Sequence, residues 1–264
     1  MTDLTPLDTA HAAMEAAPDE DAARLRFYER LADCELFMLL TQEADGDNIS
    51  PEVFDLADES FVLVFDREDR LAQFVGKPAP YAAMSGRVIA GLLAEQGIGM
   101  GVNLDVAPSS ILIPPQAVGW LAGTLGNAPS EAEARIEALA PPRGLPDLLL
   151  TALDAKLASA AGLAEAAYLL GVTFEGGTKG HMLAFVDAAP GAHGALAKAV
   201  AEALTFSGIE AGALDVAFFR NAEPMAARLA QYGLRFDLPQ PAETVQEMLR
   251  MAPGSDPAKP PILR

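Results

Sequence analysis

The sequence predicts an α+β protein with two domains, each a small mixed sheet with packed helices. The chain has 264 residues, and at roughly 150 residues per domain this length suggests two domains. In both halves, short apolar segments typical of buried strands alternate with segments of helical periodicity. A stretch over 127–144 contains three prolines and no strong apolar face. We interpret this stretch as a domain linker that can contain a short helix.

Composition and charge exclude several classes of function. The chain is 51% hydrophobic and 21% charged, which is typical of a globular protein. Its formal net charge of -19 repels phosphate backbones and anionic membrane surfaces, so we expect no nucleic-acid and no membrane partner. We interpret the acidic charge as a solvated surface. An acidic docking surface for a basic partner is the alternative.

The sequence predicts a soluble protein of a reducing compartment. Cys34 is the single cysteine, so the chain cannot form an internal disulfide. The first residues lack a basic start followed by an apolar run, so we expect no signal peptide. The uncharged segment 106–130 contains adjacent prolines, which a lipid-facing helix does not tolerate. We therefore expect a cytoplasmic location.

The first domain is expected over 19–126, after a flexible arm over 1–18 that shows no clear apolar period. A helix over 20–32 follows a cap at Asp19. Further helices are expected after Asp66, after Ser85 and from Pro114-Pro115, the last with Val118, Leu121 and Leu125 on its buried face. The strands expected in this domain are 35–43, 53–56, 61–66, 98–104 and 110–113.

The second domain is expected over 145–239 in the order αββαβαβ, with its helices on one face of the sheet. Its first helix starts at Pro146 and carries Leu149, Leu153 and Leu157 on one stripe. The remaining elements expected here are strands at 167–174, 181–187, 214–219 and 234–238 and helices at 191–206 and 224–232. A glycine-rich turn over 175–180 predicts a hairpin between the first two strands. We expect a flexible tail over 240–264.

No motif in the chain predicts a metal site, a cofactor or a catalytic group. His11, His181 and His193 have no metal-ligand spacing, and each is interpreted as a surface histidine. The glycines at 97–101 follow a helix and precede a strand, the reverse of a dinucleotide-binding order. We interpret Cys34 as a small core residue rather than a nucleophile. The chain is therefore predicted not to be an enzyme, although scattered residues can assemble a site that one sequence does not reveal.

Two groups of polar residues remain as candidate ligand or partner contacts. Asn103, Ser109 and Ser110 lie in turn or strand-edge positions around 105–108. Arg220 and Asn221 follow a strand and precede a helix start, a geometry that can hold an anion. Ordinary turn chemistry and helix capping are the alternative for both groups.

The stretch over 61–120 resembles the N-terminal domain of the SseB family, named for enhanced serine sensitivity. The resemblance rests on FVLVFDREDRLAQF at 61–74, APYAAMSGRVIAGLL at 79–93 and GIGMGVNLDVAPSSILIPPQAV at 97–118. The segments LLLTALDAKLA at 148–158, AYLLGVTF at 167–174 and LDVAFF at 214–219 look like the C-terminal domain that accompanies it. Asn103-Leu104-Asp105 departs from the Asn-Pro-Gly expected of the family. The resemblance implies a link to serine tolerance and no catalytic residues.

Two functions from different classes are consistent with these observations. The first is a non-enzymatic accessory or regulatory protein that acts through contacts with an unknown protein partner. The alternative is a binding module for a small anionic metabolite such as an amino acid, with Arg220 and Asn221 at its site. The sequence predicts neither the oligomeric state nor the packing of the domains.

Overall fold

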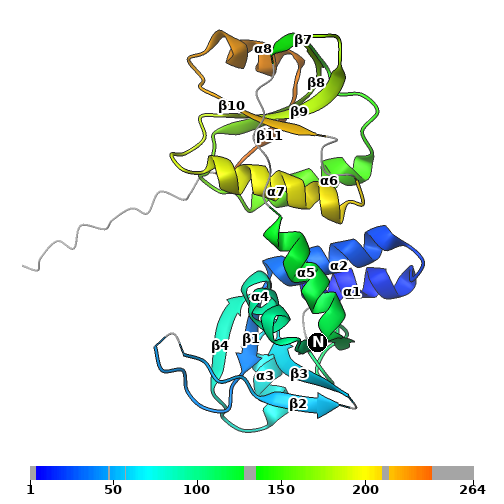
Figure 1. The fold of residues 1–264 in the computed structure, drawn as a ribbon, viewed down its shortest axis with the longest axis vertical. Coiled ribbons are helices and arrows are strands. Elements are labelled where there is room, and N and C mark those ends of the chain that lie inside the picture. The colour runs from blue at the N-terminus through cyan, green and yellow to red at the C-terminus, as the bar shows by residue number, and fades with distance from the viewer. Residues whose placement is uncertain (1–3, 47, 57, 128–134, 210–213, 240–264) are drawn as a thin grey trace, which may run out of the picture.

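The computed structural model describes residues 4–46, 48–56, 58–127, 135–209 and 214–239. These residues form two mixed sheets with packed helices, which confirms the predicted α+β class (Figure 1). Strands that precede residue 127 build one sheet, and strands that follow residue 135 build the other. The predicted tail over 240–264 lies outside the described residues.

The first sheet has the strand order β4-β1-β3-β5-β6, and β2 pairs with part of β3. Its strands are β1 (Glu35–Leu39), β2 (Val53–Leu56), β3 (Glu59–Phe65), β4 (Tyr81–Ser85), β5 (Gly99–Val102) and β6 (Ile111–Ile113). β3 and β5 are parallel, and the other pairs are antiparallel. Two of the predicted strands end early, because Leu40 and Thr41, which follow β1, pair with Pro51 and Ser50, and the chain turns after β5 at Asn103.

Helices cover both faces of the first sheet. They are α1 (Pro6–Ala16), α2 (Asp21–Asp33), α3 (Glu68–Val75), α4 (Gly86–Gln96) and α5 (Pro115–Gly126). The helices α2, α4 and α5 bury their apolar faces against Val62 and Val64 of β3. On the opposite face, Leu71 of α3 packs against Leu63 and Phe65. This alternation along β3 follows from the period of two in a strand.

The predicted flexible arm over 1–18 is wrong where the structure describes it, because residues 6–16 form α1. Thr5 is its N-cap and forms a reciprocal capping box with Asp8, and Pro6 occupies the first turn. Leu7 is 1% exposed and belongs to the first core. His11 was expected at the surface but is buried, with its ring edge-on to Phe27. Tertiary burial therefore holds a helix that has little apolar periodicity of its own.

The strand β4 was not predicted, because prolines 78 and 80 mark this stretch as a helix breaker. Its five residues pair with β1 along their whole length, from Glu35 opposite Ser85 to Leu39 opposite Tyr81. The alanine-rich sequence YAAMS has weak strand propensity of its own. Pairing with a buried neighbour decides its conformation.

The second sheet has the order β10-β9-β8-β11, and β7 pairs with the remaining part of β8. Its strands are β7 (Ile136–Ala140), β8 (Ala166–Phe174), β9 (Lys179–Val186), β10 (Asp215–Phe219) and β11 (Leu234–Asp237). β9 and β10 are parallel and the other pairs antiparallel. β7 lies inside the predicted linker over 127–144, so the described residues at 136–140 belong to the sheet and not to a linker or a helix. The predicted hairpin over 175–180 is confirmed.

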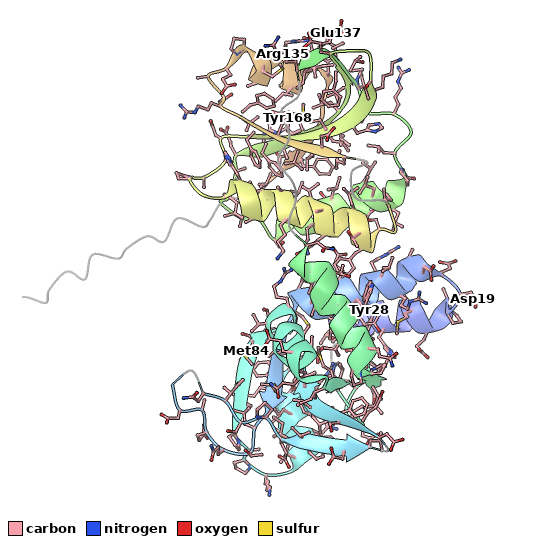
Figure 2. All side chains as sticks on the ribbon, viewed as in Figure 1. Asp19, Tyr28, Met84, Arg135, Glu137 and Tyr168 are labelled. Carbon is pink, nitrogen blue, oxygen red and sulfur yellow. The ribbon has the colours of Figure 1, made fainter. Side chains whose placement is uncertain are left out.

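Helices lie on both faces of the second sheet, and the expectation of one covered face is wrong. They are α6 (Asp147–Ala158), α7 (His193–Phe206) and α8 (Pro224–Tyr232). α6 and α7 share a core with Leu169 of β8, whereas Leu229 of α8 packs with Tyr168 and Leu170 (Figures 1 and 2). Successive residues of β8 are thus apolar on opposite faces of the sheet. Helices must therefore pack against both faces to bury them.

The two halves share part of one core. Phe206, at the end of α7, is 1% exposed and belongs to the core of the first sheet. Its ring lies edge-on to Trp120 of α5, which in turn lies edge-on to Tyr28 of α2. Within the described residues, no helix is long and apolar enough to cross a membrane.

Candidate functional site

Asn103 and Ser109, singled out from the sequence, lie together in a buried polar cluster. Both side chains are 0% exposed. Asn103 Nδ2 donates a hydrogen bond to Ser109 Oγ at 2.9 Å, and Asn103 Oδ1 accepts one from the backbone of Asp66. Ser109 Oγ donates to Asp8 Oδ1 at 2.6 Å. These side chains therefore form their hydrogen bonds within the chain, and neither is exposed to solvent.

The third residue of this group, Ser110, closes the turn between β5 and β6. Its hydroxyl accepts a hydrogen bond from the backbone N–H of Asp105 at 3.2 Å. Asn103 and Asp105 have positive φ values of 47° and 58°. Asp and Asn tolerate this left-handed region better than other side chains. Asp105 therefore fills the place where the family resemblance leads us to expect glycine.

Arg70 is the cation at the centre of this cluster. Its guanidinium lies 2.5 Å from Asp8 and 2.7 Å from Asp66, and all three side chains are at most 3% exposed. Burial disfavours the charge on Asp8, but hydrogen bonds from Arg70, Ser109 and Thr5 outweigh it and hold the pKa of Asp8 well below its ordinary value. Asp66 also accepts from the Thr5 hydroxyl at 2.6 Å. Asp66, predicted as a helix cap, instead helps to hold α1 against α3, and we call this group the Arg70 cluster.

Arg220 and Asn221 lie before α8, where the sequence suggested an anion site. The backbone N–H of Arg220 donates to Glu223 at 3.1 Å, and the backbone N–H of Asn221 donates to Asp187 at 3.0 Å. Both side chains are exposed. The chain's own carboxylates thus occupy the donors that an anion would need.

A second charged cluster joins the two halves. Lys156 of α6 is 7% exposed and pairs with Asp33 of α2 at 2.7 Å and with Glu202 of α7 at 2.9 Å. Arg87 of α4 pairs with the same two carboxylates. Burial alone would lower the pKa of Lys156, but the two carboxylates outweigh it and the pKa is raised. The cluster therefore stays charged and ties α2 and α4 to α6 and α7.

One pocket in the second half has a volume of about 410 Å³. It is lined by Pro141, Pro142, Arg143, Gly144, Leu145, Leu150, Tyr232, Gly233 and Leu234. Arg143 is exposed and is the one charged side chain of this lining. Arg220 and Asn221 do not contribute to it. Ligand sites of this size usually have several convergent polar groups, which this lining lacks.

The strand β2 is the most exposed strand of the first sheet. All four of its residues are exposed, and three of them are apolar: Val53 at 46%, Phe54 at 37% and Leu56 at 54%. Asp55 accepts a hydrogen bond across the strand pair from Ser60 Oγ at 2.7 Å. Because strand side chains alternate between faces, the sheet is uncovered on both sides at β2.

Exposed large apolar side chains gather in the first half of the chain. Of the ten found among the described residues, nine precede residue 127. They are Leu4, Val53, Phe54, Leu56, Tyr81, Val88, Leu92, Leu112 and Trp120. The exception is Leu234 of β11. Contiguous exposed apolar residues mark surfaces that contact other molecules, and Val53, Phe54 and Leu56 adjoin one another on β2. Local sequence patterns do not identify these residues as exposed, because exposure depends on which faces the folded chain leaves uncovered.

Comparison with known proteins bears on the first half alone. Residues 9–120 match the family model described as the SseB protein N-terminal domain. This part of the chain is therefore similar to an SseB N-terminal domain, and the match runs from within α1 to the middle of α5. No curated protein and no solved structure matches the chain. In the described part of the chain, no group of three or more His, Cys, Asp or Glu residues is placed to hold a metal ion.

Proposed function

We propose that this protein, with its SseB N-terminal domain, is a non-enzymatic accessory or regulatory protein that acts through protein contacts. The observation that carries the proposal is the gathering of exposed apolar side chains on that domain. The buried charged side chains of the Arg70 cluster and around Lys156 pair with one another, although Arg70 Nε has no hydrogen-bond partner among the described residues. The family name adds a link to serine tolerance, and the lone cysteine favours a reducing compartment such as the cytoplasm.

The alternative, a binding module for a small anionic metabolite, has weaker support. The donors proposed for it at Arg220 and Asn221 already bind Glu223 and Asp187. A ligand at about 100 times its dissociation constant stabilises a protein by roughly 2.7 kcal/mol. A thermal shift of this size with any amino acid would restore the alternative.

Affinity capture of the intact tagged protein from its own cells tests the proposal. We expect a stoichiometric protein partner that is lost from a variant carrying Leu56→Ser, Leu92→Ser and Leu112→Ser. These residues lie on β2, α4 and β6 and are all at least 40% exposed, so their replacement leaves the core intact. Leu234→Ser on the second sheet, at 43% exposure, is the matched control. Recovery of the bare protein, or equal loss in the control, would contradict the proposal.

A further inference from the structure

We propose that β2 accepts an added strand from a partner segment that alternates basic and apolar residues. The inference rests on the proposed function and names the surface and the chemistry of the partner. Its starting point is the pairing of β2, which joins β3 along one edge, from Val53 opposite Val62 to Leu56 opposite Glu59. No strand in the described ranges pairs with the other edge of β2.

The unpaired edge offers both backbone and side-chain contacts. In an antiparallel pair, alternate residues direct their N–H and C=O groups away from the neighbouring strand. Those groups of β2 are free to pair with an extended segment, and such pairing supplies affinity in strand addition. Phe54 and Leu56 lie on one face of the sheet and Val53 on the other. An added strand with apolar residues would cover these side chains.

The charge around β2 selects a basic partner. Between Arg30 and Arg67 the chain contains no lysine or arginine. The carboxylates adjacent to or within the β2–β3 hairpin are Glu52, Asp55, Asp58 and Glu59. None of these four side chains forms an ion pair with another described residue. Opposite charges across a strand pair stabilise it, so lysine or arginine side chains on the added strand complement this edge.

The same charge disfavours a second copy of this chain at the edge. Pairing of β2 with β2 of another copy would place acidic side chains beside one another, and like charges across strands are destabilising. Edge strands commonly carry charge for this reason, because it prevents pairing with identical copies. The single acid Asp55 among three exposed apolar residues thus disfavours self-pairing and favours a basic strand.

Titration of the intact protein with a labelled, capped octapeptide of alternating lysine and valine tests the inference. We expect saturable binding, with the largest amide chemical-shift changes in β2. A peptide of the same sequence, N-methylated at alternate residues, keeps its charge but cannot pair through its backbone, so we expect it to lose binding. The double variant Asp55→Lys with Asp58→Lys reverses two charges. It should weaken binding of the unmodified peptide about tenfold, since each cross-strand charge pair contributes modestly to the binding free energy.

The matched control is Glu15→Lys with Asp19→Lys, which changes net charge by the same amount at exposed positions of the α1–α2 corner, away from β2 (Figure 2). Equal binding of the two peptides, equal loss in the two variants, or largest shift changes outside β2 and its partner β3 would each overturn the inference. If the peptide does not bind while the cellular partner is still captured, the inference of an added strand is refuted and the proposed function stands. If the β2 variant does not fold, the two peptides on the unaltered protein decide the question.

Discussion

Replacement of Arg70 with methionine should release α1 from the first domain. Arg70 is 2% exposed, and its loss leaves Asp8 and Asp66 buried without their cation. Removal of one partner of a buried ion pair costs about 3–5 kcal/mol. Ser109 and Thr5 still donate to these carboxylates, so we expect the lower end of that range, about 3 kcal/mol. At 1.4 kcal/mol for each factor of ten, this corresponds to a roughly hundredfold change in the opening equilibrium.

Hydrogen exchange followed by mass spectrometry measures this change directly. Amides of α1 in Arg70→Met should exchange roughly a hundredfold faster, because α1 opens separately from the rest of the domain. Arg67→Met is the matched control, since Arg67 pairs with Asp69 at an exposed site, where an ion pair contributes about 0–1 kcal/mol. Equal protection of α1 in the two variants would refute the role of the Arg70 cluster.

Three further predictions follow from the charges and burial described above. Lys156→Met should lower the melting temperature by about 6–12 °C, from a loss of about 3 kcal/mol, whereas the exposed Lys179→Met should change it little. Folding lowers the pKa of Asp8 below 3.8, so its stabilisation is complete above that pH and is lost as the pH falls toward the folded value. The melting temperature of the unaltered protein should therefore fall more steeply than that of Asp8→Asn between about pH 4 and pH 2, and equal slopes would contradict this. Burial raises the pKa of the Cys34 thiol to about 12, so iodoacetamide at neutral pH should label Cys34 in the unfolded chain and not in the folded one.

Local patterns predicted the helices from α2 to α8 and the hairpin over 175–180. The stripe of Val118, Leu121 and Leu125 is buried in α5 as expected, and so is the leucine stripe of α6. Each of these elements carries its own periodicity, so one segment of sequence is sufficient to identify it. The glycine-rich turn similarly fixes the register of β8 and β9.

Elements that depend on distant partners were missed. The strands β4 and β7 are short and alanine-containing, and their pairing with β1 and β8 decides their conformation. The helix α1 is held by Arg70, which lies 62 residues away from Asp8 in the chain. A local signal for α1 was present in Thr5-Pro6-Leu7-Asp8, because a hydroxyl residue followed three positions later by an acid is typical of a helix start.

The candidate sites likewise include residues that a local pattern identifies and a surface that depends on distant parts of the chain. The sequence singled out Asn103 and Ser109 as candidate ligand or partner contacts. In the structure both form hydrogen bonds within the chain, Asn103 with Ser109 and Ser109 with Asp8. The exposed edge at β2 was beyond local patterns, since VFDL reads as an ordinary strand until its neighbours are known. Exposure is a property of the sheet order, and a single segment does not encode it.

Site-specific photo-crosslinking in living cells is the most direct test of the central claim that the protein acts through contacts of its first domain. A crosslinking residue at position 56 of β2 should yield one discrete adduct with a protein that presents a basic segment, and the same residue at position 234 of β11 should yield none. Both positions carry an exposed leucine, so access of the probe is matched. Absence of an adduct at position 56, or equal adducts at both positions, would contradict the account.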